Sequence, residues 1–153
     1  MSDQKNDTLG GATLWIKTCL PEPSDKDFHT QLGVFSEEVG ETLLEVAALD
    51  KETGDLLLKA INAMTQLGNH LKKSQGKIFV GPYSRQAFLD GLCDVGVTIS
   101  TTAYTQQLDL VGAMHEVNRA NFSKFVNGVP IFNENHKVAK GPDYIKPDLS
   151  SFV

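Results

Sequence analysis

The chain has 153 residues, of which 41% are hydrophobic and 22% are charged, which suits one globular domain over residues 1–153 with one hydrophobic core. The formal net charge of −5 argues against a protein that holds a nucleic acid backbone through clustered positive charge. Cys19 and Cys93 stand far apart in apolar surroundings, which favours free thiols in a reducing compartment. The N-terminus lacks a hydrophobic signal core, and no apolar run reaches the ~18 residues of a membrane span. We therefore expect a cytoplasmic protein with no membrane or nucleic acid partner.

The first predicted elements are a short helix and a long one. Residues 1–8 form a polar lead, and LWIKTCL indicates a short helix that the prolines of PEPSD end. Ser24 or Asp25 is a candidate N-cap for the helix that follows. Its apolar positions recur at three- and four-residue steps, at Phe28, Leu32, Phe35, Val39, Leu43 and Val46.

Three further helices and an irregular tail complete the chain. Apolar periodicity predicts helices from about Asp55 to Ser74, closed by Gly76, from near Phe88 to about Gln107, and from Leu110 to about Phe125. Between the first two lies the FVGPYS loop. Glycine and proline punctuate residues 127–153, where PIFNENHKVAKG suggests a small hairpin around Asn133 to His136. The fold class is thus all-α, a bundle of four main helices over about 25–126, with an extended tail that is ordered only if it packs on something.

The stretch FSEEVGETLLE crowds four glutamates into three helical turns, Glu37, Glu38, Glu41 and Glu45. At ~100° per residue they share one broad strip of the helix. A solvated face is the ordinary explanation, but such faces usually interleave lysines, and none occurs between Asp27 and Asp50, where His29 is the only candidate base. The strip also borders the apolar face. These two observations favour a functional role for the carboxylates.

The predicted helix from near Phe88 to about Gln107 repeats this pattern. Asp90 and Asp94 lie about 40° apart on one face, and no lysine or arginine occurs from Gln86 to Gln107. Both faces of this helix are therefore expected to be at least partly buried. Buried carboxylates without cationic partners must protonate or bind metal, and oxygen ligands select hard cations. We expect Mg²⁺, with Mn²⁺ as a substitute.

Other known site types lack their residues. A di-iron helical bundle needs Glu-x-x-His on two helices, and none of His29, His70, His115 and His136 follows a glutamate at that spacing. The sequence also contains no P-loop and no Gly-x-Gly-x-x-Gly fingerprint.

With these motifs in place, the chain resembles a known superfamily. EEVGE, residues 37–41, is similar to the Glu-Glu-x-x-Glu motif of the all-α nucleoside triphosphate pyrophosphohydrolases, which include MazG, dimeric dUTPases and phosphoribosyl-ATP pyrophosphohydrolase. LDGLCDVGVTISTTA resembles the second metal-binding helix, and HEVNRANFSKFVNGVPIFNENHKVAKGPDYIKPDL resembles the C-terminal part of the phosphoribosyl-ATP pyrophosphohydrolase-like branch, found in bacteria and phages. The usual second motif is Glu-x-x-Asp, but Gly91 stands three residues before Asp94, so Asp90 is the candidate substitute.

The resemblance implies a role for each acidic residue. Glu38, Glu41 and Asp94, with Asp90, would bind the metal, and Glu37 matches the position of the general base. Glu45 has no role in the resemblance and is either a supporting residue or a solvated side chain. The implied reaction hydrolyses a (deoxy)nucleoside triphosphate between its α- and β-phosphates to a monophosphate and pyrophosphate.

A triphosphate also needs cationic partners, and the C-terminal third supplies basic residues, among them Arg119 and Lys146. Asn118, Asn121 and Lys124 recur at three-residue spacing on one side of the fourth helix. The candidate substrate-binding residues are Asn118, Asn121, Lys124, Lys137, Lys140 and Tyr144. The alternative for each lysine is an ordinary solubilising side chain.

We therefore predict a Mg²⁺-dependent nucleotide pyrophosphohydrolase. The resemblance implies a homodimer or homotetramer, in the cytoplasm of a bacterium or of a phage-infected cell, with a purine preference, for dGTP above all, in a phage or house-cleaning role. The alternative is a non-catalytic helical module with a nucleotide-binding or regulatory role. It is suggested by Gly91, which stands where the resemblance expects a metal-binding glutamate. A purely structural helical oligomer is the third reading, and it would bind no divalent metal.

Overall fold

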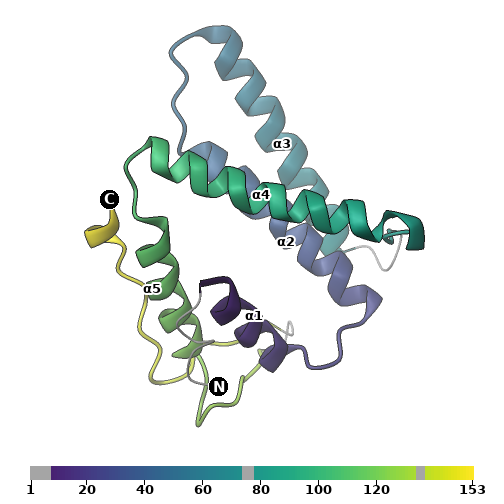
Figure 1. Ribbon diagram of the computed structural model, residues 1–153, viewed down its shortest axis with the longest axis vertical. Helices are drawn as coiled ribbons and strands as arrows, with labels where there is room; N and C mark the ends of the chain where they lie inside the picture. Colours follow the sequence, from purple (N-terminus) through teal and green to yellow (C-terminus); the bar gives the residue numbers. More distant parts are fainter. Residues whose placement is uncertain (1–7, 74–77, 134–136) are drawn as a thin grey trace. The chain divides into compact units, whose positions relative to one another are not determined.

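A computed structural model describes residues 8–73, 78–133 and 137–153. In these residues the secondary structure consists of five α-helices and two 3₁₀ turns, without a β-strand, so the all-α prediction is confirmed (Figure 1). The elements in chain order are α1 (Thr8–Cys19), α2 (Asp25–Leu44), α3 (Lys51–Lys73), η2 (Pro82–Ser84), α4 (Arg85–Thr105), α5 (Leu110–Phe122) and η3 (Ser150–Phe152). No described helix is both long and apolar enough to cross a membrane.

The chain divides into two compact units, and each is described by itself. One unit is continuous, Glu22–Pro82, and contains α2 and α3. The other joins Met1–Pro21 to Tyr83–Val153 and contains α1, α4 and α5.

The continuous unit is a hairpin of two antiparallel helices. Ser24 is the N-cap of α2, as predicted, and forms a capping box in which the Ser24 hydroxyl accepts from the Asp27 amide while the Asp27 carboxylate accepts from the Ser24 amide. The helix ends at Leu44, two residues before the predicted stripe does. Helix α3 begins at Lys51, four residues earlier than predicted, because the Asp50 carboxylate accepts from the Thr53 amide at 2.8 Å. The predicted end at Ser74 and Gly76 lies outside the described residues.

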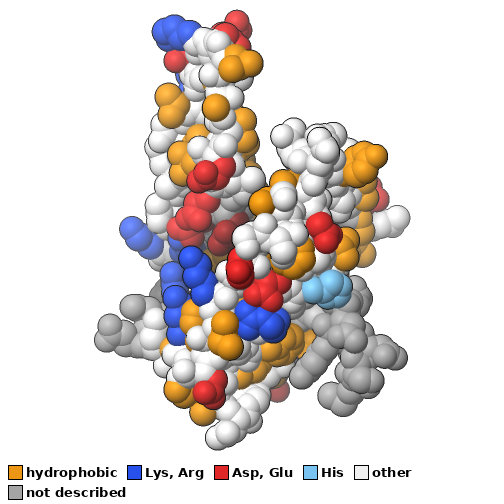
Figure 2. Space-filling model, turned by 90° about the vertical axis from the view of Figure 1, so that its left-hand side faces the viewer, with side chains coloured by type: hydrophobic (Ala, Val, Ile, Leu, Met, Phe, Trp, Pro, Cys, Tyr) orange, Lys and Arg blue, Asp and Glu red, His pale blue; other side chains and the backbone are white. Residues whose placement is uncertain are grey.

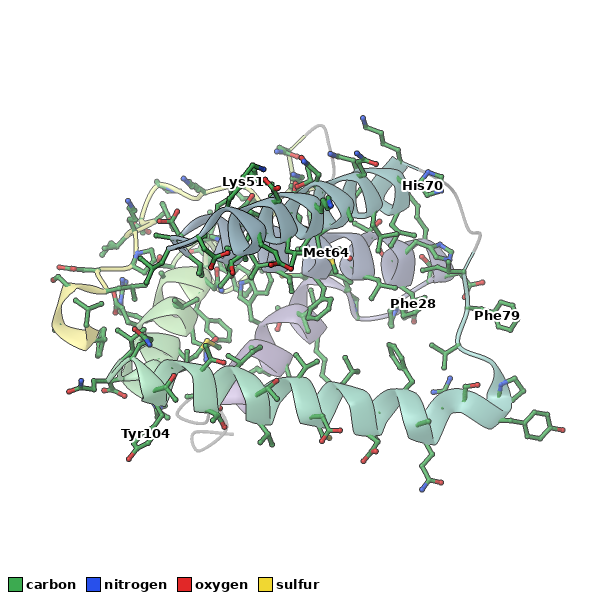
Figure 3. All side chains as sticks on the ribbon, turned by 90° about the horizontal axis from the view of Figure 1, so that it is seen from above. Phe28, Lys51, Met64, His70, Phe79 and Tyr104 are labelled. Atoms are coloured by element: carbon green, nitrogen blue, oxygen red, sulfur yellow. The ribbon has the colours of Figure 1, made fainter. Side chains whose placement is uncertain are left out.

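Two glycines let α2 and α3 approach at backbone distance. A Cβ atom built on Gly33 would lie 2.9 Å from the carbonyl oxygen of Gly68, and one on Gly68 would lie 2.8 Å from that of Gly33. Further along, Gly40 meets Met64, whose side chain lies on the side of α3 that faces α2 (Figure 3). Side chains larger than hydrogen cannot occupy the first crossing without a shift of backbone.

The discontinuous unit is organised around α1 and α5. The Trp15 indole N–H donates to the carbonyl oxygen of Asn121 at 3.0 Å, and the Trp15 ring stacks with Phe125. The Asn118 amide donates to the Thr8 carbonyl at 2.8 Å. The predicted short helix is therefore longer than LWIKTCL, since it begins at Thr8, and α5 holds it at both ends.

Helix α4 is mostly exposed, and Ala103 is the buried residue on it. The prediction that both of its faces are at least partly buried is therefore wrong for the single chain. The absence of lysine and arginine does not reflect burial here, because neutral hydroxyl residues occupy exposed positions of the helix. The hydroxyl groups donate to carbonyl oxygens three or four residues earlier, at Thr98, Ser100, Thr101 and Thr102. The helix ends at Thr105, two residues early, and Gln107 takes the left-handed conformation with φ 60°. Tyr104 projects outwards near this end (Figure 3).

The tail packs on α5 and runs back along it. A tight turn with left-handed Asn127 and Gly128 pairs Val126 with Val129, and the Gly141 amide then donates to the Lys124 carbonyl at 3.1 Å. The contacts that follow are Ile145 with Ser123, Asp148 with Glu116, and Phe152 with Asp109. Phe132 and Val138 pair as a predicted hairpin requires, although its turn at 134–136 lies outside the described residues.

Candidate functional site

The glutamate strip lies on the last turns of α2. Glu38 and Glu41 are exposed, Glu37 is half-buried, and Glu45 caps the helix C-terminus. Among the described residues, neither Glu38 nor Glu41 forms an ion pair. Their carboxylate oxygens are therefore available to a ligand from outside the continuous unit.

Glu37 has a cationic partner that the sequence did not reveal. The Lys72 ammonium donates to Glu37 Oε1 at 2.6 Å, and both side chains are largely shielded from solvent. The pair follows from the glycine crossing, because a Cβ on Gly33 would lie 2.9 Å from Lys72 Cγ and one on Gly68 would lie 3.3 Å from the Glu37 amide nitrogen. The base that partly cancels the charge of the strip thus comes from α3.

His29, the candidate base within α2, has a different function. It is 2% exposed, and its Nε2 contacts the Ile78 carbonyl oxygen at 2.6 Å. This contact holds the chain after α3 against α2. His29 is therefore a structural residue of the helical hairpin.

The aspartates of the predicted metal site lie in the other unit. Asp90 and Asp94 are exposed on α4, one helical turn apart, and neither forms an ion pair within the described part of the chain. Residues 8–73, 78–133 and 137–153 contain no group of three or more His, Cys, Asp or Glu side chains close enough to hold a metal ion. Since α2 and α4 belong to different units, the four-ligand site stays a prediction.

Four predicted substrate-binding residues, Asn121, Lys124, Lys140 and Tyr144, come together at the C-terminal end of α5. Lys124 Nζ donates to Asn121 Oδ1 at 2.7 Å and lies 6.0 Å from the centre of the Tyr144 ring. Lys140 Nζ lies 4.9 Å from the same ring. The close approach of Gly141 to the Lys124 carbonyl brings Lys140 next to Lys124.

Trp15 is the residue of this cluster that the sequence analysis missed. Its ring lies 5.5 Å from Lys124 Nζ, a cation–π distance, and is fixed by the hydrogen bond to Asn121. Burial is the main cause that lowers the pKa of Lys124, and the neighbouring Lys140 ammonium lowers it further. No local signal in the sequence links Trp15 to Lys124, because the two residues lie more than 100 positions apart.

The remaining predicted substrate-binding residues, Asn118 and Lys137, and the basic residue Arg119 have other contacts. Asn118 is 3% exposed, and its amide holds the Thr8 carbonyl, while Asn118 Oδ1 has no partner among the described residues. Lys137 is exposed, and its backbone pairs with Asn133. The Arg119 guanidinium binds Glu116 through two hydrogen bonds of 2.7 and 2.6 Å.

Comparison of the chain with protein-family models, with curated proteins and with solved structures found no match.

Proposed function

We propose that the protein is a Mg²⁺-dependent nucleoside triphosphate pyrophosphohydrolase that cleaves between the α- and β-phosphates. The observation that carries this proposal is the strip on α2, where two exposed carboxylates without ion pairs, Glu38 and Glu41, adjoin a half-buried one, Glu37. A helix face of this kind offers ligand oxygens and a base within one turn.

The donor set fits a hard divalent cation. Glu38 and Glu41 supply carboxylate oxygens from α2, and Asp94 with Asp90 would supply them from α4, whether of the same chain or of another copy. A bound Mg²⁺ would neutralise phosphate charge and acidify a water molecule.

Glu37 is proposed to take the proton of the attacking water. The water oxygen forms a bond to one of the two phosphorus atoms joined by the α–β bridging oxygen, and its proton passes to the Glu37 carboxylate. The bond from that phosphorus to the bridging oxygen breaks, and the bridging oxygen leaves with the other product, so that a monophosphate and pyrophosphate are formed. The ion pair with Lys72 restricts the rotamers of Glu37, which makes Lys72 a positioning residue. Lys124, Lys140 and Tyr144 are proposed to hold phosphates of the substrate.

Exposed apolar side chains support the further proposal of a homo-oligomer. They occur on both long helices outside α2, at Leu56, Leu58 and Leu67 of α3 and at Leu89, Leu92, Val97 and Ile99 of α4. Hydrophobic side chains also reach the surface on the face drawn in Figure 2. At ~100° per residue Leu89, Leu92 and Ile99 share one face of α4, and an exposed apolar face is typical of an interface.

Product analysis tests the function. The purified protein is incubated with each natural ribo- and deoxynucleoside triphosphate with and without Mg²⁺, and the products are identified. We expect a monophosphate and pyrophosphate, with dGTP the best substrate. Metal-dependent nucleotide binding without turnover would instead support the non-catalytic module, and release of orthophosphate alone would reject the proposed cleavage site.

A further inference from the structure

Two ammonium groups converge on one aromatic ring near the end of α5. Lys124 lies between two rings, since its Nζ is 5.5 Å from the centre of Trp15 and 6.0 Å from that of Tyr144. Lys140 lies over Tyr144 at 4.9 Å. Neither lysine forms an ion pair with another described residue. The contacts of the two ammonium groups shown for the described residues are with ring faces and with the Asn121 amide oxygen.

The backbone holds this pair of like charges together. Gly141 accepts no larger side chain without a shift, because a Cβ there would lie 2.8 Å from the Lys124 carbonyl oxygen. The Gly141 amide donates to that same oxygen, and the Tyr144 amide donates to the Gly141 carbonyl at 3.1 Å. Lys140 and Tyr144 thus stay beside Lys124 although repulsion between the ammonium groups opposes their approach.

We propose that Lys124 and Lys140, framed by Trp15 and Tyr144, form a binding site for a phosphate group that does not require a metal ion. A phosphate dianion matches the two charges, and its oxygens accept hydrogen bonds from both ammonium groups. A carboxylate monoanion would leave one charge uncompensated. The site deepens the proposed function and rests on it only where the phosphate is identified as part of a nucleotide.

Trp15 makes the site measurable. It is the only tryptophan in the chain, so fluorescence excited selectively at tryptophan, and not at the three tyrosines, reports on the neighbourhood of Lys124. Metal-free protein is titrated with inorganic phosphate, pyrophosphate and dGTP, each against chloride at the same ionic strength, and with acetate as the monoanion. We expect saturable changes with the three phosphates and none with acetate. A higher affinity for dGTP than for pyrophosphate identifies the nucleotide as the source of the phosphate.

Matched lysine variants locate the site. Lys140→Met should weaken phosphate binding about tenfold or more, because a charge-assisted hydrogen bond is lost. Lys17→Met is the control, since Lys17 is exposed and about 200° around α1 from Trp15. An NMR titration of the lysine side chains provides a second readout, in which bound phosphate should raise the pKa of Lys124.

The proposal is overturned if Lys140→Met binds phosphate as tightly as the parent, or if neither fluorescence nor NMR responds to phosphate beyond the chloride control. Its failure is distinct from that of the enzyme. Phosphate binding without any nucleotide turnover rejects the proposed function alone, whereas turnover without phosphate binding in the metal-free protein rejects this site alone.

Discussion

Gly33 and Gly68 face each other where α2 crosses α3, so closely that a Cβ atom built on either glycine would lie 2.8–2.9 Å from the carbonyl oxygen of the other. This contact sets the separation of the two helices and their register. It also brings Lys72 of α3 level with Glu37 of α2, whose carboxylate it binds at 2.6 Å.

Gly68→Ala should therefore destabilise the helical hairpin, by ~1–3 kcal/mol, because the added methyl group forces the backbones apart. Urea unfolding followed by circular dichroism measures the change. Gly54→Ala in the same helix is the control, since its Cβ would meet Ala48 at an ordinary 3.6 Å and alanine favours the helix. Equal stabilities of Gly68→Ala and Gly54→Ala would show that the close crossing is not rigid.

Glu38→Gln and Asp94→Asn should each abolish Mg²⁺-dependent turnover while leaving the helices folded, because each removes a ligand charge at constant volume.

Glu37→Gln should keep metal binding and lose rate by about 10²–10⁴-fold, as for the removal of a general base. Steady-state kinetics with a Mg²⁺ titration measure both effects. Turnover by Glu38→Gln at the parental rate would contradict the ligand assignment, and weak metal binding by Glu37→Gln would contradict the division of roles.

The docking of the tail on α5 should weaken in acid. Hydrogen bonds from Arg119 and from the Asp148 amide lower the pKa of Glu116 from 4.5 to about 2. A depressed carboxyl pKa means that the ionised form stabilises the fold, so the contribution is complete above about pH 4.5 and is lost as pH falls towards about 2. Hydrogen exchange at the Asp148 amide, measured across this range, should accelerate as Glu116 protonates.

Glu116→Gln should loosen the same amide at neutral pH. Asp143→Asn is its control, because Asp143 is an exposed acid of the tail that forms no ion pair with another described residue. Equal protection of the Asp148 amide in the two variants would show that the carboxylate of Glu116 does not hold the tail.

Asn118→Ala should destabilise the discontinuous unit by ~1–3 kcal/mol, because the buried Asn118 amide no longer donates to the half-buried Thr8 carbonyl. Thermal unfolding followed by Trp15 fluorescence measures this change. If Asn118 instead contacts the nucleotide, as its spacing with Lys124 predicts, the variant will raise KM while its melting temperature stays at the parental value.

Local signals in the sequence predicted the helices well and their ends less well. Ser24 was one of two N-cap candidates because cap signals are local, and the capping box that it forms spans only the four residues from Ser24 to Asp27. The start of α3 was missed although Asp50 and Thr53 carry a similar signal, because the apolar stripe begins later than the helix. The Asn127–Gly128 turn had a recognisable sequence too, since Asn-Gly favours left-handed turns.

The site was harder to predict because its pairs join distant segments. Lys72 stands 35 positions from Glu37, and Trp15 stands 106 positions from Asn121, so neither contact follows from helical periodicity. Burial was misjudged on α4 because neutral hydroxyl side chains, such as that of Thr101, replace charges without being buried. The glycines at positions 33 and 68 were the sequence signal for the register of the hairpin, because glycine allows two helices to approach closely.

The docked tail also constrains the order in which the chain can fold during synthesis. Phe152 of η3 accepts a hydrogen bond from the Asp109 amide ahead of α5, and α1, far earlier in the sequence, packs on that same helix. The α2–α3 hairpin is continuous in sequence and can fold as soon as it leaves the ribosome. Helix α1 is made before α5 and must wait for it, and the unit they share cannot be completed until Phe152 has left the ribosome.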